Sequence, residues 1–267
     1  MGGDYGRMRN PYDVSATLAH GEPWERLEAM QKLEEIAIQC RTEANAVIGK
    51  CTTPAELEKL KPWRSFRRKI GFPLFNLVLK IAQGPSGTQL RDLAADILAH
   101  LWHPAAVDRL VEDLSKNGDA LRPSQLSGIF DNLAGIGNEP ALKALLKLWD
   151  EGYEYDVVIP IGSCNSKVGE AFLMRQAREH KDSSLRGYCI LAFGREHSPE
   201  KVSLLRDKLK NGTPLERSAA IRRIGDMGLI SLSSELIAIH NGTNDEKLKT
   251  EILDTLRYLH NSRHQAA

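Results

Sequence analysis

Cysteine and histidine side chains are the groups of this sequence that come nearest to nucleophilic chemistry. Cys164 lies in the stretch Gly162-Ser163-Cys164-Asn165, and any of the eight histidines can in principle supply a base to its thiol. His103 and His197, however, stand beside prolines, where we expect surface or turn-capping residues. The sequence contains no GxSxG, P-loop, HExxH or dinucleotide-binding motif, and its four cysteines form no CxxC pair. We therefore interpret Cys164 as a buried or loop thiol and expect no catalytic residue, metal site or cofactor.

The densest group of side chains suited to recognition is the segment 149–156, which holds four acids and three aromatic residues in eight positions. Interfaces favour Trp and Tyr as anchors, and clustered carboxylates steer a basic partner. Trp149 lies seven residues after Leu142, in phase with a helix core, and we expect it to be buried. The alternative is that the acids form a solvated turn. The candidate partner-binding residues are Asp150, Glu151, Tyr153, Glu154, Tyr155 and Asp156.

A second candidate is the basic segment 59–69, in which six of eleven residues are Lys or Arg and none is acidic. Arginines interleaved with aromatic residues can contact phosphates and stack on bases. They can equally dock an acidic protein surface, or lay their aliphatic stems over the end of a helical array. The three interpretations stay open at this point. This secondary basic patch consists of Lys61, Trp63, Arg64, Arg67, Arg68 and Lys69.

The net charge of +1 conceals an uneven distribution along the chain. Residues 1–85 carry 13 Lys and Arg against 10 Asp and Glu, residues 86–185 carry 10 against 15, and residues 186–267 carry 13 against 10. A basic, acidic and basic order argues against one continuous groove for nucleic acid. It leaves room for local patches of either sign.

The elements that must position these residues repeat along the chain. Short breaks that contain glycine recur at intervals of 34, 34, 60 and 30 residues. The interval of 60 corresponds to two periods, and Asp182 lies near the position where the intermediate break is expected. A period of 30–34 residues suits one pair of helices with its two turns, and glycine suits a left-handed helix end. These breaks fall at Gly84, Gly118, Gly152, Gly212 and Gly242.

Within each period the apolar side chains follow the i, i+3, i+4, i+7 spacing of an amphipathic helix, and no run alternates as a strand does. Prolines follow turns at positions 104, 140 and 199, where the first turn of a second helix accepts them. The pattern predicts about ten or more helices and essentially no strand. The expected core includes Leu98, Leu110, Ile129, Leu145, Phe193 and Ile224.

Two stretches carry a family resemblance. Leu215–Gly228, with the sequence LERSAAIRRIGDMG, resembles the first helix of a HEAT repeat of the phycobilisome-lyase-like type. Leu133–Leu142, LAGIGNEPAL, resembles its inter-helix turn. The resemblance covers about residues 86–260 and implies an all-α, HEAT-like α-solenoid of stacked antiparallel helix pairs. Repeats of this type occur in lyase subunits, scaffolds, inhibitors and assembly factors, so the resemblance specifies fold and not function.

Two regions depart from the repeat pattern. Residues 1–85 have helical stretches without a clean repeat, as terminal units that cap a solenoid commonly do. Near residues 153–166, Pro160 and Gly162 are expected to interrupt any long helix. We therefore expect a helical capping region at 1–85, repeats at 86–260 and a frayed tail at 261–267.

These observations favour a non-enzymatic, protein-binding solenoid, either a scaffold or an inhibitor or immunity-type protein that masks a basic partner with the acidic middle of the chain. The alternative from the enzyme class is a bilin lyase subunit or tetrapyrrole-handling factor, which rests only on the type of repeat resembled. The second alternative is nucleic-acid binding through segment 59–69. The sequence has neither a secretory signal nor a transmembrane stretch, so we expect a cytoplasmic protein without a membrane partner.

Overall fold

The computed structural model describes residues 11–48, 54–85, 88–117 and 121–265, and all regular structure within these ranges is helical. The expected all-α, HEAT-like fold of stacked helix pairs is therefore confirmed. No helix within the described ranges combines the length and the apolar character needed to cross a membrane. The chain forms two compact units, Met1–Ala141 and Leu142–Ala267. The expected division into a capping region at 1–85 and repeats at 86–260 rests on the repeat pattern of the sequence. The two compact units do not test that pattern, so the division stays a prediction.

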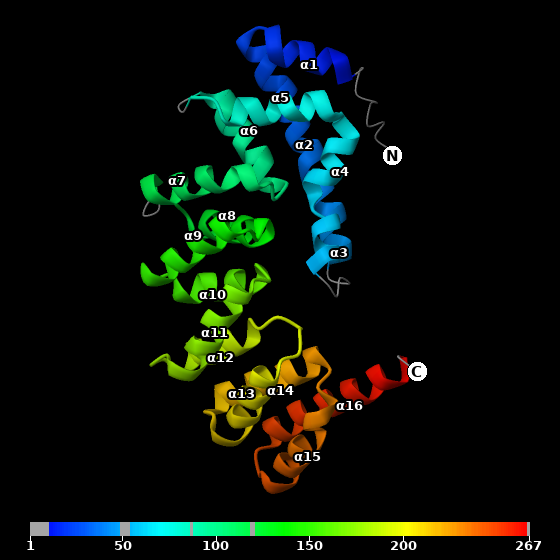
Figure 1. The fold of residues 1–267 in the computed structure, drawn as a ribbon, viewed down its shortest axis with the longest axis vertical. Coiled ribbons are helices and arrows are strands. Elements are labelled where there is room, and N and C mark those ends of the chain that lie inside the picture. Colours follow the sequence, from blue (N-terminus) through cyan, green and yellow to red (C-terminus); the bar gives the residue numbers. More distant parts are fainter. Residues whose placement is uncertain (1–10, 49–53, 86–87, 118–120, 266–267) are drawn as a thin grey trace. The chain divides into compact units, whose positions relative to one another are not determined.

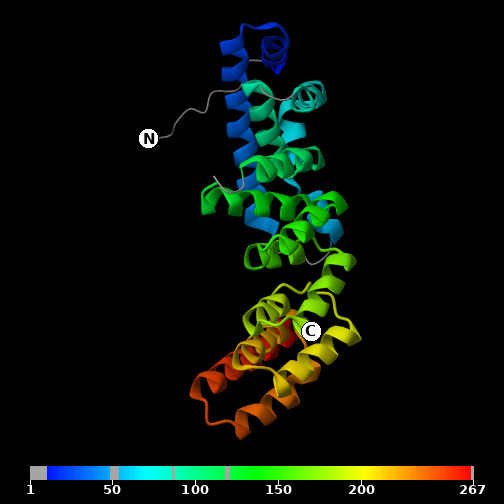
Figure 2. The same ribbon diagram turned by 90° about the vertical axis from the view of Figure 1, so that its left-hand side faces the viewer.

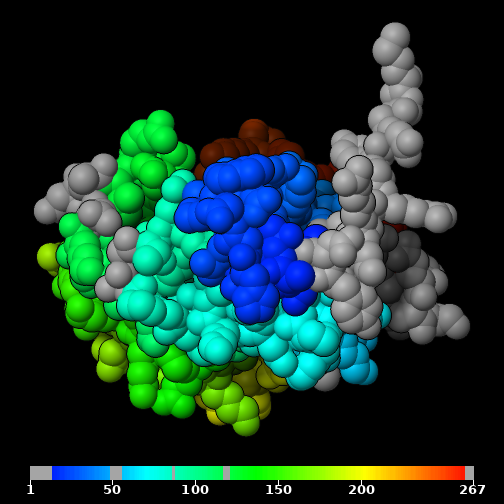
Figure 3. Space-filling view, turned by 90° about the horizontal axis from the view of Figure 1, so that it is seen from above, coloured from blue at the N-terminus to red at the C-terminus, as the bar shows by residue number. Residues whose placement is uncertain are grey.

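The N-terminal unit is organised around the long helix α2, which packs against α1, α4 and α6 (Figures 1 and 2). Helix α5 packs against α1, α4 and α6, and Figure 3 shows the blue α1 and α2 against the cyan helices that follow them. The helices of this unit are α1 (Pro11–His20), α2 (Pro23–Ile48), α3 (Pro54–Lys59), α4 (Pro62–Ile70), α5 (Phe72–Ala82), α6 (Gln89–His100), η1 (Pro104–Ala106), α7 (Val107–Asn117) and α8 (Pro123–Ile136).

The C-terminal unit has two layers, and helix α9 leads into it from the first unit. Helices α10, α12, α14 and α16 pack in series as one layer, while α11, α13 and α15 cover one side of it (Figure 1). The helices are α9 (Glu139–Asp150), α10 (Glu154–Ser163), α11 (Lys167–Glu179), α12 (Ser183–Leu191), α13 (Pro199–Asn211), α14 (Pro214–Met227), η3 (Ile230–Leu232), α15 (Ser233–Gly242) and α16 (Glu246–Gln265). This layering leaves the other side of the α10–α16 layer without a covering helix in the described part of the unit.

Most helix ends fall where glycine and proline predict them. Helix α13 begins at Pro199 after the N-cap Ser198 and ends at Asn211. Gly152, after α9, has the expected left-handed backbone with φ +98°. Gly84, Gly212 and Gly242 do not have a positive φ, so the expected left-handed conformation is wrong at these three breaks. Gly212 has φ −70° and ψ 156°, an extended conformation that turns the chain directly into α14. The break expected at Gly118 lies outside the described residues.

The expected interruption at Pro160 and Gly162 is wrong, because α10 continues through both residues. Proline removes one backbone donor from the helix, yet Pro160 is buried and its ring adds to the core. Gly162 has a packing role, since a Cβ atom there would lie 2.0 Å from the carbonyl oxygen of Ala192. These residues let α10 pack closely against the end of α12 and do not break it.

The predicted core and tail need two corrections. Leu98, Leu110, Leu145, Phe193 and Ile224 are buried as expected. Ile129 is only half-buried. The tail expected to be frayed is helical as far as Gln265, with Ala266 and Ala267 outside the described residues.

Candidate functional site

The uncovered side of the α10–α16 layer carries exposed aromatic and aliphatic side chains. Tyr155 of α10 is 48% exposed and Tyr188 of α12 is 44% exposed, and their rings meet edge to face with centroids 5.8 Å apart. Such an arrangement stabilises an aromatic pair beyond the area that it buries. Large apolar side chains on α10, α14 and α16 are also exposed. We call this surface the tyrosine face and define it by Tyr155, Ile159, Tyr188, Leu215 and Tyr258.

Asp182 fixes the position of Tyr155. The Tyr155 hydroxyl donates to Asp182 Oδ2 at 2.6 Å, and Asp182 also caps α12 by accepting from the backbone N–H of Ser184 at 2.8 Å. The hydrogen bond to Asp182 raises the pKa of Tyr155, and the same bond lowers the pKa of Asp182. An exposed tyrosine is thus held in one orientation at neutral pH.

The six residues predicted from segment 149–156 lie around the start of this face. Asp150 and Glu151 are exposed at the end of α9, and Glu151 pairs with Lys147 at 3.2 Å. Tyr153 is half-buried at the N-cap of α10, and the first turn of α10 contains Glu154, Tyr155 and Asp156. Carboxylates in a first turn also stabilise a helix through its dipole, so part of this cluster has a local structural role.

Trp149 is buried, as expected, and forms part of the support for this region. Its ring meets Phe172 edge to face at 5.1 Å and His180 at 6.0 Å. His180 Nε2 lies 3.9 Å from the Glu154 carboxylate. The tryptophan therefore ties α9 to α11 and is not available as an interface anchor.

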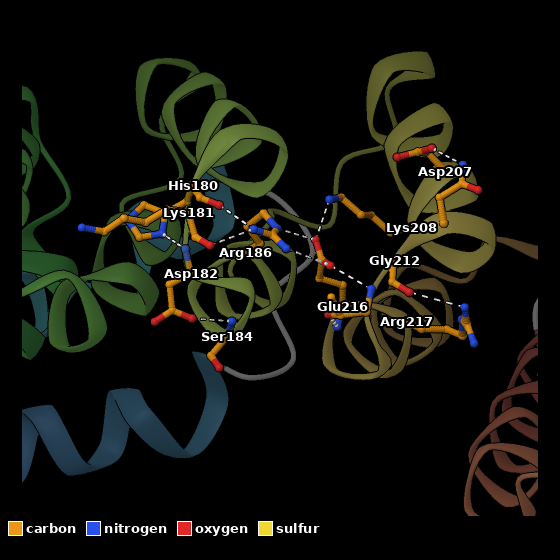
Figure 4. Close-up of polar contacts among 12 residues, drawn as sticks. His180, Lys181, Asp182, Ser184, Arg186, Asp207, Lys208, Gly212, Glu216 and Arg217 are labelled. Atoms are coloured by element: carbon orange, nitrogen blue, oxygen red, sulfur yellow. Dashed lines mark hydrogen bonds and ion pairs between the residues drawn. The ribbon is translucent and has the colours of Figure 1, made fainter.

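A buried ionic network lies behind the tyrosine face and joins α12, α13 and α14. Glu216 is 2% exposed and accepts from Arg186 Nε at 2.7 Å, Lys208 Nζ at 2.6 Å and the N–H of Thr213 at 2.9 Å. Figure 4 shows the two cations approaching this carboxylate from opposite sides. Burial raises the pKa of the Glu216 carboxyl, but the hydrogen bonds from Arg186 and Lys208 outweigh burial and hold that pKa well below its usual range.

Sequence reasoning missed this network. A signal for part of it existed, because Thr213 and Glu216 form a capping box that the T-x-x-E pattern before α14 predicts. Arg186 lies 30 residues earlier and Lys208 on the preceding helix, and no spacing rule identifies either as a partner of Glu216. The network holds the helices that carry Tyr188 and Leu215 in register.

The basic patch of segment 59–69 is largely occupied by its own contacts. Trp63 meets the His103 ring edge to face at 5.5 Å, while Arg64 and Arg67 lie over the Trp63 ring at 4.5 and 5.2 Å. The pKa of His103 is lowered to about 4 by burial and by the Lys61 charge. The indole is thus covered by neighbours from its own unit.

The remaining cations of the patch also have partners, with one exception in the described residues. Lys61 Nζ donates to the carbonyl oxygen of Ile136 at 2.7 Å and pairs with Glu58 at 3.0 Å. Lys69 pairs with Glu43 at 2.9 Å. Arg68 is exposed and makes no ion pair within the described part of the chain. This geometry favours the interpretation in which the patch covers one end of a helical array.

The three cysteines that the structure describes are buried in the fold. Cys40, Cys164 and Cys189 are buried and form no disulfide with a described residue, while Cys51 lies outside the described residues. Burial raises the pKa of Cys189 to about 12, which keeps that thiol protonated at neutral pH. Within the described ranges no three His, Cys, Asp or Glu side chains come together in a way that can hold a metal ion.

Comparison with known proteins adds little to this picture. The sequence matches no protein-family model, and no curated protein matches it. Among solved structures, the complex of CpcE and CpcF of phycocyanin lyase from Nostoc sp. PCC7120 is similar over 96% of this chain and 90% of that chain. The identity is 17% and the TM-score 0.38, a level of likeness that carries no argument about function.

Proposed function

We propose that this chain is a protein-binding module whose partner docks on the tyrosine face of the C-terminal unit. The observation that supports the proposal best is the pair Tyr155 and Tyr188, which is exposed yet held by ring contact and by Asp182. Tyrosines that are rigid before binding lose little conformational entropy when a partner covers them, and they are typical energetic anchors of interfaces.

The charge around the face favours a partner with a basic surface. Asp150, Glu151 and Asp156 are exposed at its α10 end. Clustered carboxylates raise the association rate of a basic protein and suppress acidic competitors. Such a module serves either as a scaffold or as an inhibitor or immunity-type protein that masks a basic toxin or enzyme. The inhibitor version predicts that the bound partner loses its own activity.

The test uses affinity capture from the native host with quantitative mass spectrometry. Wild type is compared with the double variant Tyr155→Ala, Tyr188→Ala and with Trp24→Ala, a control that removes a 65% exposed aromatic side chain from the N-terminal unit. A partner retained by wild type and by the control but lost by the double variant supports the proposal. A partner bound equally by all three proteins contradicts it. Loss of a true anchor typically costs about 2 kcal/mol or more of binding.

The two alternatives stay predictions with tests of their own. A bilin lyase or tetrapyrrole-handling role is tested by adding a linear tetrapyrrole and recording the absorbance of the bound pigment. Nucleic-acid binding through segment 59–69 is tested by a gel shift at increasing salt, since phosphate contacts weaken steeply as salt rises. The occupied contacts of Trp63, Arg64 and Lys69 give this last role no specific support.

A further inference from the structure

A groove with a volume of about 310 Å³ lies between α14 and α16 in the C-terminal unit. At its floor Gly225 lets the two helices approach, since a Cβ atom there would lie 3.3 Å from Cγ2 of Thr255. Arg222 and Tyr258 line its walls and are exposed, so the groove opens on the same side of the layer as the tyrosine face. The groove shares Tyr258 with the tyrosine face and does not include Tyr155 or Tyr188.

Two hydroxyl groups in the groove make no hydrogen bond to another residue that the structure describes. Thr255 is only 9% exposed, yet its hydroxyl makes no hydrogen bond to any described residue. Ser218, which is half-buried in the opposite wall, is in the same situation within the described chain. Neither oxygen is buried without a partner, so both are accessible from the groove and can accept hydrogen bonds from an occupant that supplies donors.

The charge of the groove identifies the kind of group that fits. Three carboxylates line it, those of Asp226, Glu251 and Asp254, against one cation, Arg222. Asp226 pairs with Arg223 at 3.5 Å and Asp254 with Arg257 at 3.1 Å, while Glu251 makes no ion pair within the described residues. A free carboxylate beside two hydroxyl acceptors and a tyrosine ring favours a planar cation with several donors.

We propose that this groove binds an arginine side chain from a basic segment of the protein partner. The guanidinium group donates to Glu251 and to the hydroxyls of Ser218 and Thr255, and its face lies against Tyr258. Arginine fits better than lysine because its five donors lie in a fixed plane, whereas an ammonium is a compact point charge. The proposal rests on the proposed protein-binding function and specifies the chemistry of the partner.

The test does not need the natural partner. The full-length protein is titrated with three short acetylated, amidated peptides that differ at one residue, arginine, lysine or the neutral isostere citrulline. Backbone amide shifts of Gly225 and Thr255 are followed by NMR. We expect saturable shifts with the arginine peptide, at least threefold weaker binding of the lysine peptide and no saturable binding of citrulline. No saturable shift with arginine, or equal binding of citrulline, overturns the proposal.

Variants assign the effect to the groove. Glu251→Gln should weaken the arginine peptide at least fivefold, and Thr255→Val should weaken it two- to threefold. Glu246→Gln is the matched control, because Glu246 is on the same helix, is highly exposed and forms a surface pair with Lys249. Equal weakening by the control, or unchanged binding by Glu251→Gln, contradicts the proposal.

The two proposals fail in distinguishable ways. In one outcome the arginine peptide binds in a way that depends on Glu251, but the captured partner binds equally well without Tyr155 and Tyr188. That outcome contradicts the proposed docking face and supports the arginine site in the groove. A partner whose binding needs both tyrosines but is unchanged by Glu251→Gln contradicts the proposed arginine site in the groove. The proposed docking on the tyrosine face is then still supported.

Discussion

Segments 59–69 and 149–156 are equally conspicuous in the sequence, but they use their side chains in opposite ways. In the first, Trp63 is covered by Arg64, Arg67 and His103 from its own unit. In the second, Tyr155 reaches the surface and meets another exposed tyrosine, Tyr188. A cluster of charged and aromatic residues is therefore no guide to a free surface until its internal partners are known.

The difference arises from where the opposite charges lie. Segment 59–69 has no acid of its own, but the fold brings Glu58 and Glu43 to its cations. Segment 149–156 keeps Asp150 and Asp156 exposed without an ion pair among the described residues. The acid that is buried in the C-terminal unit, among the described residues, is instead Glu216, which pairs with Arg186 and Lys208 and does not belong to an acidic cluster in the sequence.

The largest effect should come from Glu216→Gln. Removing its charge leaves Arg186 and Lys208 facing each other in a buried site, and breaking such a network typically costs about 3–5 kcal/mol. Chemical denaturation with probes in each unit measures the loss. Glu151→Gln is the control, because its exposed pair with Lys147 should contribute less than about 0.5 kcal/mol. Equal effects from the two variants would remove the contrast between buried and exposed acids.

Trp63→Ala should have the next largest effect on stability. The ring packs between Phe75 and His103, and a large aromatic removed from such a site costs about 3 kcal/mol. Tyr155→Ala should cost less, about 1 kcal/mol, because the tyrosine is half exposed and loses only its ring contact with Tyr188 and its hydrogen bond to Asp182. Both are measured by urea unfolding. A Trp63 variant as stable as wild type would mean that the aromatic side chain of segment 59–69 is not structural.

Acid should remove the contribution of His103 to the N-terminal unit before it weakens the Glu216 network. The folded-state pKa of His103 is about 4 against a usual 6.5, so between these values the unfolded chain binds a proton that the folded chain does not. The His103 contribution to stability falls as pH drops from 6.5 towards 4, by up to about 3 kcal/mol. Asp96 on α6 acts in the opposite sense, because burial raises its pKa to about 6 and the folded chain then binds a proton that the unfolded chain does not. Glu216 has a lowered pKa, so its contribution is intact above about 4.5 and is lost only at lower pH.

Hydrogen exchange of α4 and α6 amides from pH 7 to 5 measures this change locally. The difference between wild type and His103→Asn isolates the imidazole from other groups that titrate in this range. The variant should show a much smaller loss of protection as pH falls. If wild type and variant show the same pH dependence, His103 is not the group responsible.

The sequence predicted the parts of the fold that local rules decide. Helical periodicity identified the buried face, and prolines and glycines marked the ends of α9 and α13, because these residues limit the backbone directly. The same rules failed at Pro160 and Gly162, since close packing against Ala192 requires a glycine and overrides its low helix propensity.

The candidate site was less predictable because it depends on residues far apart in the chain. Tyr155 was selected from its neighbours in sequence, but Tyr188 and Asp182, which orient it, lie about one repeat later. The burial of Lys201 could not be predicted for the same reason. Its side chain is fully buried, and its ammonium group donates to the carbonyl oxygens of Gly194 and Glu196. Periodicity places a lysine on the surface unless a loop closes over it.

The smallest effect is expected from neutralising the exposed Asp150 and the half-buried Glu154, in the double variant Asp150→Asn, Glu154→Gln. Stability should change by less than about 0.5 kcal/mol, because neither side chain is buried in a network like that of Glu216. Association with a basic partner should slow severalfold at low salt, since these carboxylates contribute to the attractive field, and dissociation should change little. The difference should shrink as salt rises, because the screening length falls to about 3 Å at 1 M salt.

Stopped-flow or surface-binding kinetics at several salt concentrations measure both rates. If charge reversal of Arg64, Arg67 and Arg68 to Glu abolishes binding while this variant and Tyr155→Ala bind as wild type, the partner docks on segment 59–69 and the comparison between the two segments is reversed.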